Sequence, residues 1–281
     1  MDIFEAKVLN DEDFLFFKEK IFDLSGIHLS EAKKTLIQAR LHFQLELHQL
    51  ESFAEYRAYL EKLPKSDPEF QKFVNLLTTN KTDWFREIEH FNYLEMDFIP
   101  QWLKSGKKNL RIWSAASSTG EEAYSIAMLV ERLLKGTGKN FEIVGSDIDT
   151  SVLAKAQNGV YKNEQLKNIP KEFHHYFVKG TGEISEWMKI SNSIKKFVSF
   201  EQFNLINDEY SSYKNSFDLI FCRNVLIYFT PGTIQAIADN CYQAASDKAV
   251  LLISHSESLQ NIKTKWKSKK PSIYIKGLGL Y

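Results

Sequence analysis

Along the first 80 or so residues, apolar and polar positions alternate at the spacing of amphipathic helices. One helix places its apolar residues three or four apart, at Phe14, Phe17, Ile21 and Leu24. Ser30 offers an N-cap for a second helix, and we expect that helix to carry an apolar set made of Leu36, Phe43 and Leu47. Ser52-Phe-Ala-Glu55 fits a capping box, and Asp67-Pro68 marks a further helix start. The pattern predicts a small all-helical domain, residues 1–78.

From about Asn109 the pattern changes to short apolar runs that alternate with helical periods. The runs typical of buried strands are LRIWSA, EIVGSD, FDLIFC, AVLLIS and SIYIKG. Helical periods lie between them, from Gly120 to Leu134, around Val152 to Gln157 and from Thr230-Pro231 onward. This alternation is typical of a mostly parallel sheet with helices on both faces. We therefore expect an α/β domain over residues 79–281.

A less regular piece, about residues 170–200, interrupts this alternation. Its sequence KGTGEISEWMKISNSIKKFVSF has a Gly-Thr-Gly turn and short β-branched runs. These features predict a small antiparallel insert of two or three strands. Partner binding and a purely structural role both remain open for it.

Composition and charge narrow the classes of partner. The 281 residues contain 36 Lys plus Arg and 36 Asp plus Glu, so no bulk field attracts nucleic acid or anionic lipid. Acidic residues stand where a signal peptide has its basic region, and no apolar run approaches the roughly 20 residues that span a bilayer. We expect a cytoplasmic protein without direct membrane insertion. Cys222, Cys241 and the scattered histidines show no metal-ligand spacing, so we expect reduced packing cysteines and no metal.

The stretch SAASSTGEEAYS, Ser114 to Ser125, is placed as the turn from a strand into a helix. A dinucleotide-binding turn has three glycines around a pyrophosphate, whereas this one has a single glycine followed by Glu121 and Glu122. Two acids in the first helical turn disfavour a diphosphate and favour a ligand with positive charge and hydroxyl groups. S-adenosylmethionine, with its sulfonium, ammonium and ribose diol, has that chemistry. The alternative is that Thr119-Gly-Glu-Glu122 is a capping box whose acids stabilise the helix dipole.

The next strand end adds a second polar feature. Asp147, in IVGSDID, follows Gly120 by about 27 residues, near the spacing at which nucleotide-binding folds place the acid that accepts ribose hydroxyls. Asp149 is a rival at the same turn, and Asp149 or Thr150 could equally be the N-cap of the following helix. We favour Asp147 because it comes first after the strand.

Several separated blocks share one resemblance. They are NKTDWFRE, RIWSAASSTGEEAYSIAM, GSDIDTSVLAKAQNGVY, FVSFEQFNL, FDLIFCRNVLIYF and HSESL. In this order they resemble the chemotaxis receptor methyltransferases of the CheR type, over nearly the whole chain. The resemblance implies a Rossmann-like sheet and transfer of methyl from S-adenosylmethionine to glutamate side chains in the cytoplasmic helices of methyl-accepting chemoreceptors. The products would be glutamate methyl esters, for sensory adaptation, and S-adenosylhomocysteine.

The resemblance also implies roles for individual residues. The segment that contains Asn80, Thr82 and Arg86 resembles one that closes over cofactor and substrate. Tyr228 matches a tyrosine near the transferred methyl. The positions that match cofactor contacts are Asn80, Thr82, Arg86, Glu122, Asp147, Asn204, Leu205, Arg223 and Asn224. The sequence departs from the family pattern at positions without an assigned chemical role: Trp84 for phenylalanine, Ala123 for proline and Ser254 for glycine.

The chemistry of a carboxylate nucleophile can be argued independently. A glutamate side chain with a pKa near 4.3 is ionised at pH 7 and needs no general base, whereas a lysine must first lose a proton. After FDLIFC the chain continues Arg-Asn-Val, without the Asn/Asp-Pro-Pro-aromatic motif of many amino and amide methyltransferases. An oxygen nucleophile is favoured. We assign Arg86 to orienting the carboxylate and Tyr228 to positioning the methyl or the substrate; without the resemblance, Arg86 reads as a surface residue and Tyr228 as core.

Partner recognition has two candidate surfaces. Lys33, Arg40 and Gln44 fall on one face of the second helix, either as a basic stripe that docks on an acidic receptor helix or as a solvated face. Lys179-Gly180-Thr-Gly182 resembles the part of the family's β-subdomain that, in some members, adds a receptor C-terminal peptide as an extra strand.

Two rival functions stay open: a methyltransferase for another protein target, and a non-catalytic scaffold that senses the cofactor.

Overall fold

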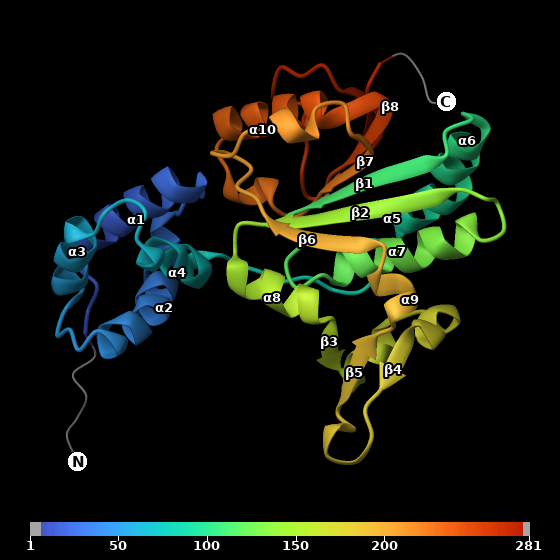
Figure 1. The fold of residues 1–281 in the computed structure, drawn as a ribbon. Helices are drawn as coiled ribbons and strands as arrows, with labels where there is room; N and C mark the ends of the chain where they lie inside the picture. The colour runs from blue at the N-terminus through green and yellow to red at the C-terminus, as the bar shows by residue number, and fades with distance from the viewer. Residues whose placement is uncertain (1–6, 278–281) are drawn as a thin grey trace. The chain divides into compact units, whose positions relative to one another are not determined.

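A computed structural model describes residues 7–277, which divide into two compact units. One unit holds the chain up to Thr79 together with Tyr228–Thr230. The other holds Asn80–Ile227 and the chain from Pro231 onward. The first is built from helices and the second around a twisted sheet (Figure 1).

The helical unit contains four α-helices in its described part, and side chains cap most of their N-termini. They are α1 (Asp11–Ser25), α2 (Lys34–Leu47), α3 (Phe53–Lys62) and α4 (Pro68–Leu77). Ser52 accepts the Glu55 N–H at 3.2 Å and Asp67 accepts the Glu69 N–H, which confirms both predicted starts. Ser30 makes no cap bond, because a 3₁₀ turn, Glu31–Lys33, separates it from α2.

Phe17 lies at the centre of the core of the helical unit. Its ring contacts the rings of Phe53, Tyr56 and Phe73, and it is fully buried. The predicted apolar face of α1 is confirmed at its three buried positions, Phe14, Phe17 and Ile21. The predicted set for α2 is wrong, since Leu36, Phe43 and Leu47 are 39 %, 58 % and 52 % exposed. The face of α2 that packs inward consists of Ile37, Leu41, Gln44 and Leu45. Apolar residues occur on both sides of this helix, so periodicity alone does not decide which side packs.

A seven-stranded sheet forms the frame of the second unit, with the order β6-β2-β1-β7-β8-β10-β9 among the described strands. Five strands are parallel, and β10 and β9 add to one edge antiparallel. The bounds are β1 Asn109–Ala115, β2 Asn140–Asp147, β6 Val198–Gln202, β7 Phe217–Cys222, β8 Ala245–Leu252, β9 Lys267–Lys270 and β10 Ile273–Ile275. All five predicted strands are present, and the carboxyl ends of the parallel strands meet at one edge.

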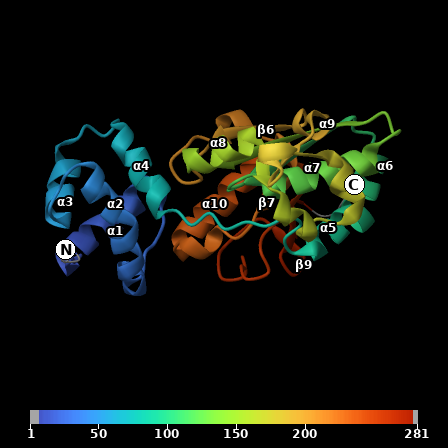
Figure 2. The same cartoon turned by 90° about the horizontal axis from the view of Figure 1, so that it is seen from below.

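Helices cover both faces of this sheet, as the alternation predicted. Figure 1 shows α10 above the strands and α7 and α8 below them, and Figure 2 shows the same helices from below. Right-handed crossovers account for this split. From β1 the chain adds β2 and β6 on one side, and it later adds β7 and β8 on the other side of β1. The helices are α5 (Ile88–Tyr93), α6 (Ile99–Lys104), α7 (Glu121–Leu134), α8 (Thr150–Asn158), α9 (Asn192–Lys195) and α10 (Pro231–Ala244). Within residues 7–277, no helix combines the length and apolar character needed to cross a membrane.

The small antiparallel sheet is present, but its limits differ from the expected residues 170–200. It consists of β3 (Val160–Lys162), β5 (Trp187–Ile190) and β4 (Phe177–Lys179), in the order β3-β5-β4. It therefore includes a strand before residue 170, while Val198–Gln202 pairs with β2 in the main sheet. A three-residue strand has too little pattern to be found by periodicity, and FVSFEQ fits either sheet.

Candidate functional site

The turn between β1 and α7 is held closely against the end of β2. Ala116, Ser118 and Gly120 adopt left-handed backbone angles, with φ of 59°, 50° and 93°. The Ser118 N–H donates to Asp147 Oδ2 at 2.8 Å. A Cβ added at Gly120 would lie 2.9 Å from the Cβ of Ala156, so both space and φ require glycine there. The turn thus presents its backbone at the carboxyl edge of the sheet.

Asp147 ends β2 and is only 6 % exposed. Its Oδ1 accepts the Asp149 N–H at 3.0 Å, and its Oδ2 accepts the Ser118 N–H. Burial raises the pKa of Asp147 to about 6, although these two N–H groups act in the opposite direction. A third backbone N–H, that of Ile148, also donates to this carboxylate, which leaves acceptor capacity for one further donor among the four lone pairs of its two oxygens. The geometry is therefore compatible with accepting hydroxyl groups of a ligand.

Asp149, the rival at this turn, is the N-cap of α8. Its Oδ1 accepts the N–H groups of Ser151 and Val152 at 2.8 and 3.3 Å. Its Oδ2 accepts from Asn80 Nδ2 at 2.6 Å. The capping alternative is confirmed for Asp149, while the cofactor role of Asp147 stays a prediction.

The segment from Asn80 to Glu87 is anchored at both ends. The Asn80 carbonyl accepts from Ser118 Oγ at 2.7 Å, next to the hydrogen bond from its amide to Asp149. Near the other end, the Phe85 N–H donates to Ser125 Oγ of α7 at 3.1 Å. Arg86 is half-buried, and its Nη1 donates to the Lys81 carbonyl at 3.1 Å. Thr82, half-buried, belongs to the same segment.

Arg223, just after β7, joins α7 to the segment Asn80–Glu87. Its Nη1 donates to Glu122 Oε2 at 2.9 Å, and its Nη2 donates to the Arg86 carbonyl at 2.7 Å. The same Nη2 lies 3.1 Å from Glu87 Oε2. The residue is 4 % exposed, so these charge-assisted bonds form out of bulk water. Arg223 therefore fixes the backbone from which the Arg86 side chain extends.

Glu122 points to Arg223 and does not cap its helix. Ser114 Oγ donates to its Oε1 at 2.7 Å, and the N-cap position is taken by Gly120, which has no side chain to cap with. The alternative of a capping box at residues 119–122 is therefore wrong. Burial raises the pKa of Glu122, while Arg223 and the Ser114 hydroxyl oppose that rise. Each Glu122 oxygen retains a lone pair beyond its protein partner.

Two left-handed residues, Glu87 and Asn224, face each other across this site with φ of 56° and 59°. Asn224 Nδ2 donates to Ser254 Oγ at 2.8 Å and lies 3.5 Å from Glu87 Oε1. Burial acts to raise the pKa of Glu87, but Arg223, Ser254 and the His255 N–H outweigh it and lower this pKa to about 2. Sequence reasoning gave Glu87 no role, although it is the last residue of the block NKTDWFRE.

Glu257 organises the loop that follows β7. Its carboxylate accepts the N–H groups of Ser254 and Leu226 at 2.8 Å each and that of Asn224 at 3.1 Å. Burial raises the pKa of Glu257, and these backbone donors oppose the rise. The block HSESL contains this residue, but only the fold shows that it bonds to the strand end some thirty positions earlier.

Replacing Glu257 by glutamine is expected to lower the free energy of unfolding by about 2 to 3 kcal/mol. The amide keeps one oxygen but turns an NH₂ group toward backbone donors, so hydrogen bonds to a charged acceptor are lost. Chemical denaturation measures the change. Glu183→Gln, at an exposed position, is the matched control and should leave stability unchanged. Equal stability of both variants would show that the Glu257 contacts contribute little.

Asn204 and Leu205 form a turn of their own after β6. Asn204 Oδ1 accepts the Ile206 N–H at 3.0 Å, and the Leu205 carbonyl accepts from Tyr210 Oη at 2.9 Å. The turn starts beside the carboxyl edge of the sheet, because the Phe203 N–H donates to the Asp147 carbonyl at 3.0 Å. The predicted adenine contacts, Asn204 and Leu205, therefore directly follow the residue that bonds to the Asp147 backbone. Their role stays a prediction.

Tyr228 and the predicted docking surface on α2 belong to the helical unit. Tyr228 belongs to the helical unit, where its carbonyl accepts the His28 N–H at 2.8 Å, and its catalytic role stays a prediction. The expected stripe on α2 is not continuous: Lys33 is exposed, Gln44 is 3 % exposed, and Arg40 Nη1 donates to the Leu77 and Thr78 carbonyls at the end of α4. Arg40 thus satisfies carbonyls that a helix end leaves free.

The glycines of the small sheet make the turn after β4. The Gly180 N–H donates to the Trp187 carbonyl at 2.8 Å, and a Cβ at Gly180 would overlap the Ile184 carbonyl oxygen. Gly182 is left-handed with φ of 59°. Lys179 ends β4, which is an edge strand of its sheet.

Residues 80–275 match the domain family described as "CheR methyltransferase, SAM binding domain". Residues 12–78 match "CheR methyltransferase, all-alpha domain". The chain belongs to the CheR methyltransferase family. Its fold, an all-helical domain followed by a Rossmann-like sheet with a small antiparallel sheet, is the one that the sequence predicted.

Relatives of this CheR methyltransferase span nearly its whole length. The "Chemotaxis protein methyltransferase" of Escherichia coli (strain K12) is 36% identical over 271 residues, which are 96% of this chain and 92% of the relative. The "Chemotaxis protein methyltransferase 2" of Pseudomonas aeruginosa is 40% identical over 248 residues, 88% of this chain and 86% of the relative. That of Borreliella burgdorferi is 34% identical over 250 residues, 86% of this chain and 87% of the relative. The chain is therefore a methyltransferase with an S-adenosylmethionine-binding domain.

The residues at the carboxyl edge fit this cofactor. Asp147 at the end of β2 and Glu122 in the first turn of α7 place carboxylate oxygens with remaining acceptor capacity near this edge. Acceptors of this kind match a ribose diol and an ammonium group and repel phosphate. Gly120, which leaves no room for a Cβ, keeps the turn backbone close to this edge.

Proposed function

We propose that this CheR methyltransferase transfers the methyl group of S-adenosylmethionine to the side-chain carboxylate of specific glutamates in chemoreceptors. The products are glutamate methyl esters, which serve sensory adaptation, and S-adenosylhomocysteine. The observation that carries the proposal is the buried Asp147 at the end of β2, together with Glu122 and Arg86, which Arg223 joins by hydrogen bonds, in a chain whose relatives are chemotaxis protein methyltransferases.

In this proposal the cofactor is held mainly by acceptors of the chain. Asp147 accepts the ribose hydroxyls, and Glu122 turns a remaining lone pair toward the cationic end of the ligand. Asn204 and Leu205 contact the adenine. Further contacts come from Asn80, Thr82, Arg86, Arg223 and Asn224. Of these, Arg223 acts largely through the residues that it orients, because its donors already reach Glu122, Glu87 and the Arg86 carbonyl.

The reaction needs alignment more than proton transfer. Bound S-adenosylmethionine supplies an electrophilic methyl group, and a glutamate carboxylate is already ionised at pH 7. The chain therefore has to place the carboxylate oxygen in line with the methyl and exclude water. Arg86 meets the carboxylate as it loses water, and Tyr228 positions the methyl or the substrate. A bond too strong in the ground state would slow transfer, so Arg86 orients the nucleophile without holding it in a closed ion pair.

Docking of the receptor would use two regions. On the helical unit, the exposed set Leu36, Phe43 and Leu47 together with Lys33 offers a mixed apolar and basic face to an amphipathic receptor helix. Arg40 supports this face through α4. On the small sheet, the edge strand β4 with Lys179, Gly180 and Gly182 at its end could add a receptor C-terminal peptide as a further strand.

Cofactor affinity is expected to fall as the pH drops below about 6. In the protein without cofactor, burial raises the pKa of Asp147 to about 6, and ribose hydroxyls donate best to the ionised carboxylate. Above this pH the carboxylate is ionised and the affinity is level; below it, protonation competes and the dissociation constant rises toward tenfold per pH unit. Calorimetric titrations from pH 8 to pH 5 measure this. A level affinity across the range would contradict the assignment of Asp147.

The function is tested by locating the methyl group on the substrate. Purified protein is incubated with S-adenosylmethionine and membranes that contain chemoreceptors, and receptor peptides are sequenced by mass spectrometry. The proposal requires an added CH₂ on glutamate side chains of the cytoplasmic receptor helices. An added CH₂ on lysine would favour an amine methyltransferase. Cofactor binding with no modified protein would favour a cofactor-sensing scaffold.

A further inference from the structure

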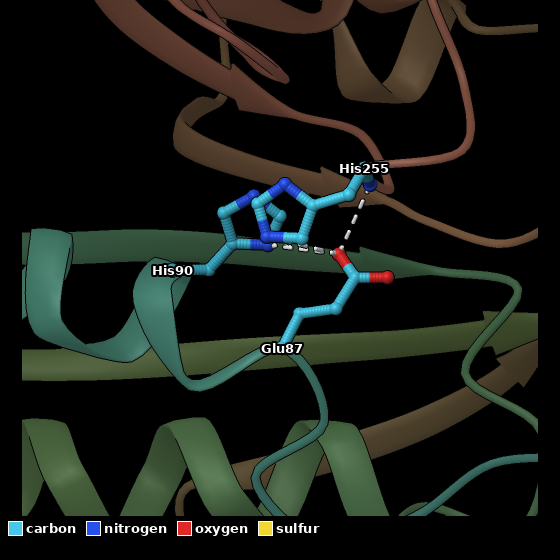
Figure 3. Close-up of side chains that lie close together, drawn as sticks. All are labelled: Glu87, His90 and His255. Carbon is cyan, nitrogen blue, oxygen red and sulfur yellow. Dashed lines mark hydrogen bonds and ion pairs between the residues drawn. The ribbon is translucent and has the colours of Figure 1, made fainter.

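Glu87, His90 and His255 converge where the segment Asn80–Glu87 ends (Figure 3). Glu87 precedes α5, His90 lies on α5, and His255 follows β8. One ligand atom from each residue lies within 4.8 Å of the other two. No ligand spacing along the sequence indicated this cluster, since the two histidines are separated by most of the α/β domain.

His90 is 1 % exposed and turns an unpartnered nitrogen toward Glu87. Its Nε2 lies 2.8 Å from Ser272 Oγ, which donates to the Pro271 carbonyl at 2.6 Å and also lies 3.4 Å from His255 Nδ1. The hydroxyl oxygen therefore accepts from Nε2–H, and Nδ1 carries the lone pair. This Nδ1 makes no hydrogen bond in the described part of the chain, and it lies 3.5 Å from Glu87 Oε2. Two electron-rich atoms thus face each other without a proton between them.

His255 supplies a third donor atom from the opposite side. Its ring stacks on that of His90, with centroids 4.8 Å apart, and its Nε2 lies 3.8 Å from Glu87 Oε2. The residue is 45 % exposed, so its ring can turn and an ion can enter from solvent. Its N–H donates to Glu87 at 3.2 Å, which keeps the backbone of His255 beside the carboxylate.

We propose that Glu87, His90 and His255 bind a divalent transition metal ion, with Zn²⁺ as the best match. Zn²⁺ takes imidazole nitrogens and a carboxylate oxygen at about 2.0 to 2.2 Å, so its ligand atoms lie about 3.3 Å apart. The separations of 3.5 and 3.8 Å, and that of the two imidazole nitrogens, which is within 4.8 Å, close to that value when the exposed His255 ring turns toward the other two ligands. Solvent at the exposed side completes a tetrahedral set. Mg²⁺ and Ca²⁺ prefer oxygen ligands and do not match two imidazoles.

The surrounding charges allow a cation here. Arg223 lies 3.1 Å from Glu87 Oε2, but its charge is also met by Glu122. Glu89 Oε2 lies 3.6 Å from His255 Nε2 and adds negative charge on the open side. The ion would share Glu87 with Arg223, and it would connect the segment Asn80–Glu87 to the loop after β8. This inference does not depend on which substrate the enzyme methylates.

Equilibrium dialysis against Zn²⁺ tests the proposal directly. The full chain is expected to bind one ion, and Co²⁺ in its place is expected to give the visible absorption of a four-coordinate nitrogen and oxygen site. His255→Ala, at a half-exposed position, removes one ligand and should weaken binding by at least the ten- to hundredfold that loss of a supporting partner costs. Glu87→Gln removes a second ligand and should do the same.

Two control variants separate this site from ordinary surface binding. His42→Ala removes a 37 % exposed histidine that also lies beside a glutamate, Glu46, and it should bind Zn²⁺ as the parent does. Glu89→Gln removes nearby charge but no proposed ligand, and it should weaken binding less than His255→Ala. Equal Zn²⁺ affinity in the parent and in His255→Ala would overturn the proposal. Absence of uptake at about 100 µM Zn²⁺ would also overturn it, because this concentration is far above the dissociation constants of structural zinc sites.

Discussion

Replacing Asp147 by alanine is expected to abolish measurable binding of S-adenosylmethionine. The buried carboxylate accepts three backbone N–H groups, and the ribose hydroxyls would donate to the acceptor capacity that remains. Hydrogen bonds to a charged group contribute about 1.5 to 3 kcal/mol each, so their loss weakens binding by about 100-fold or more. Calorimetric titration of both proteins with the cofactor measures the effect.

The substitution also leaves the Ser118 and Asp149 N–H groups without an acceptor, so folding must be checked by thermal unfolding. Asp147→Asn, which keeps the shape and one acceptor oxygen, separates loss of charge from loss of structure. Glu142→Gln removes an exposed acid from the same strand and is the control. If folded Asp147→Ala binds the cofactor as tightly as the parent, the cofactor assignment is wrong.

Replacing Arg86 by alanine is expected to weaken cofactor binding but leave it measurable, and to reduce methyl transfer about 100- to 1,000-fold. The backbone of Arg86 stays fixed, because Arg223 donates to its carbonyl, so the change removes the side chain alone. The loss should appear mainly in kcat, since the guanidinium is assigned to orienting the carboxylate during transfer. Steady-state kinetics with receptor membranes and a parallel cofactor titration measure the two quantities.

Arg132→Ala is the matched control, because it removes an arginine of similar chemistry from α7, where it pairs with Glu95. Arg86→Lys keeps the charge but loses the planar fork, and it should recover only part of the rate. A variant Arg86→Ala that transfers methyl at the rate of the parent would place Arg86 outside the reaction.

Much of the fold could be predicted because strong patterns dominate it. Runs such as FDLIFC and AVLLIS are long and apolar enough to fix buried strands, and Ser52 and Asp67 cap the helices that they were expected to cap. The errors occur where pattern is weak. On α2, apolar residues on both sides allowed the wrong face, and the three residues of β3 carry no usable period.

The hydrogen bonds among the candidate site residues could not be predicted from the sequence, and the functional roles of these residues stay predictions. Asp147 and Glu122 were expected because an acid at a strand end or in a first helical turn is visible in the sequence. The expectation could not show that Glu122 bonds to Arg223, or that Arg223 also holds the Arg86 carbonyl. Glu87 and Glu257 were missed for the same reason: their partners lie far away along the chain and meet them only after folding.

The alkali lability of the transferred methyl group tests glutamate O-methylation most directly. Receptor-containing membranes are labelled with methyl-labelled S-adenosylmethionine and this enzyme, and the receptor bands are then treated with mild base. Methyl esters hydrolyse under these conditions and methylated amines do not. If the methyl group is on glutamate, base is expected to release the label from the receptor bands as methanol. Label that stays on the protein after base would contradict glutamate O-methylation.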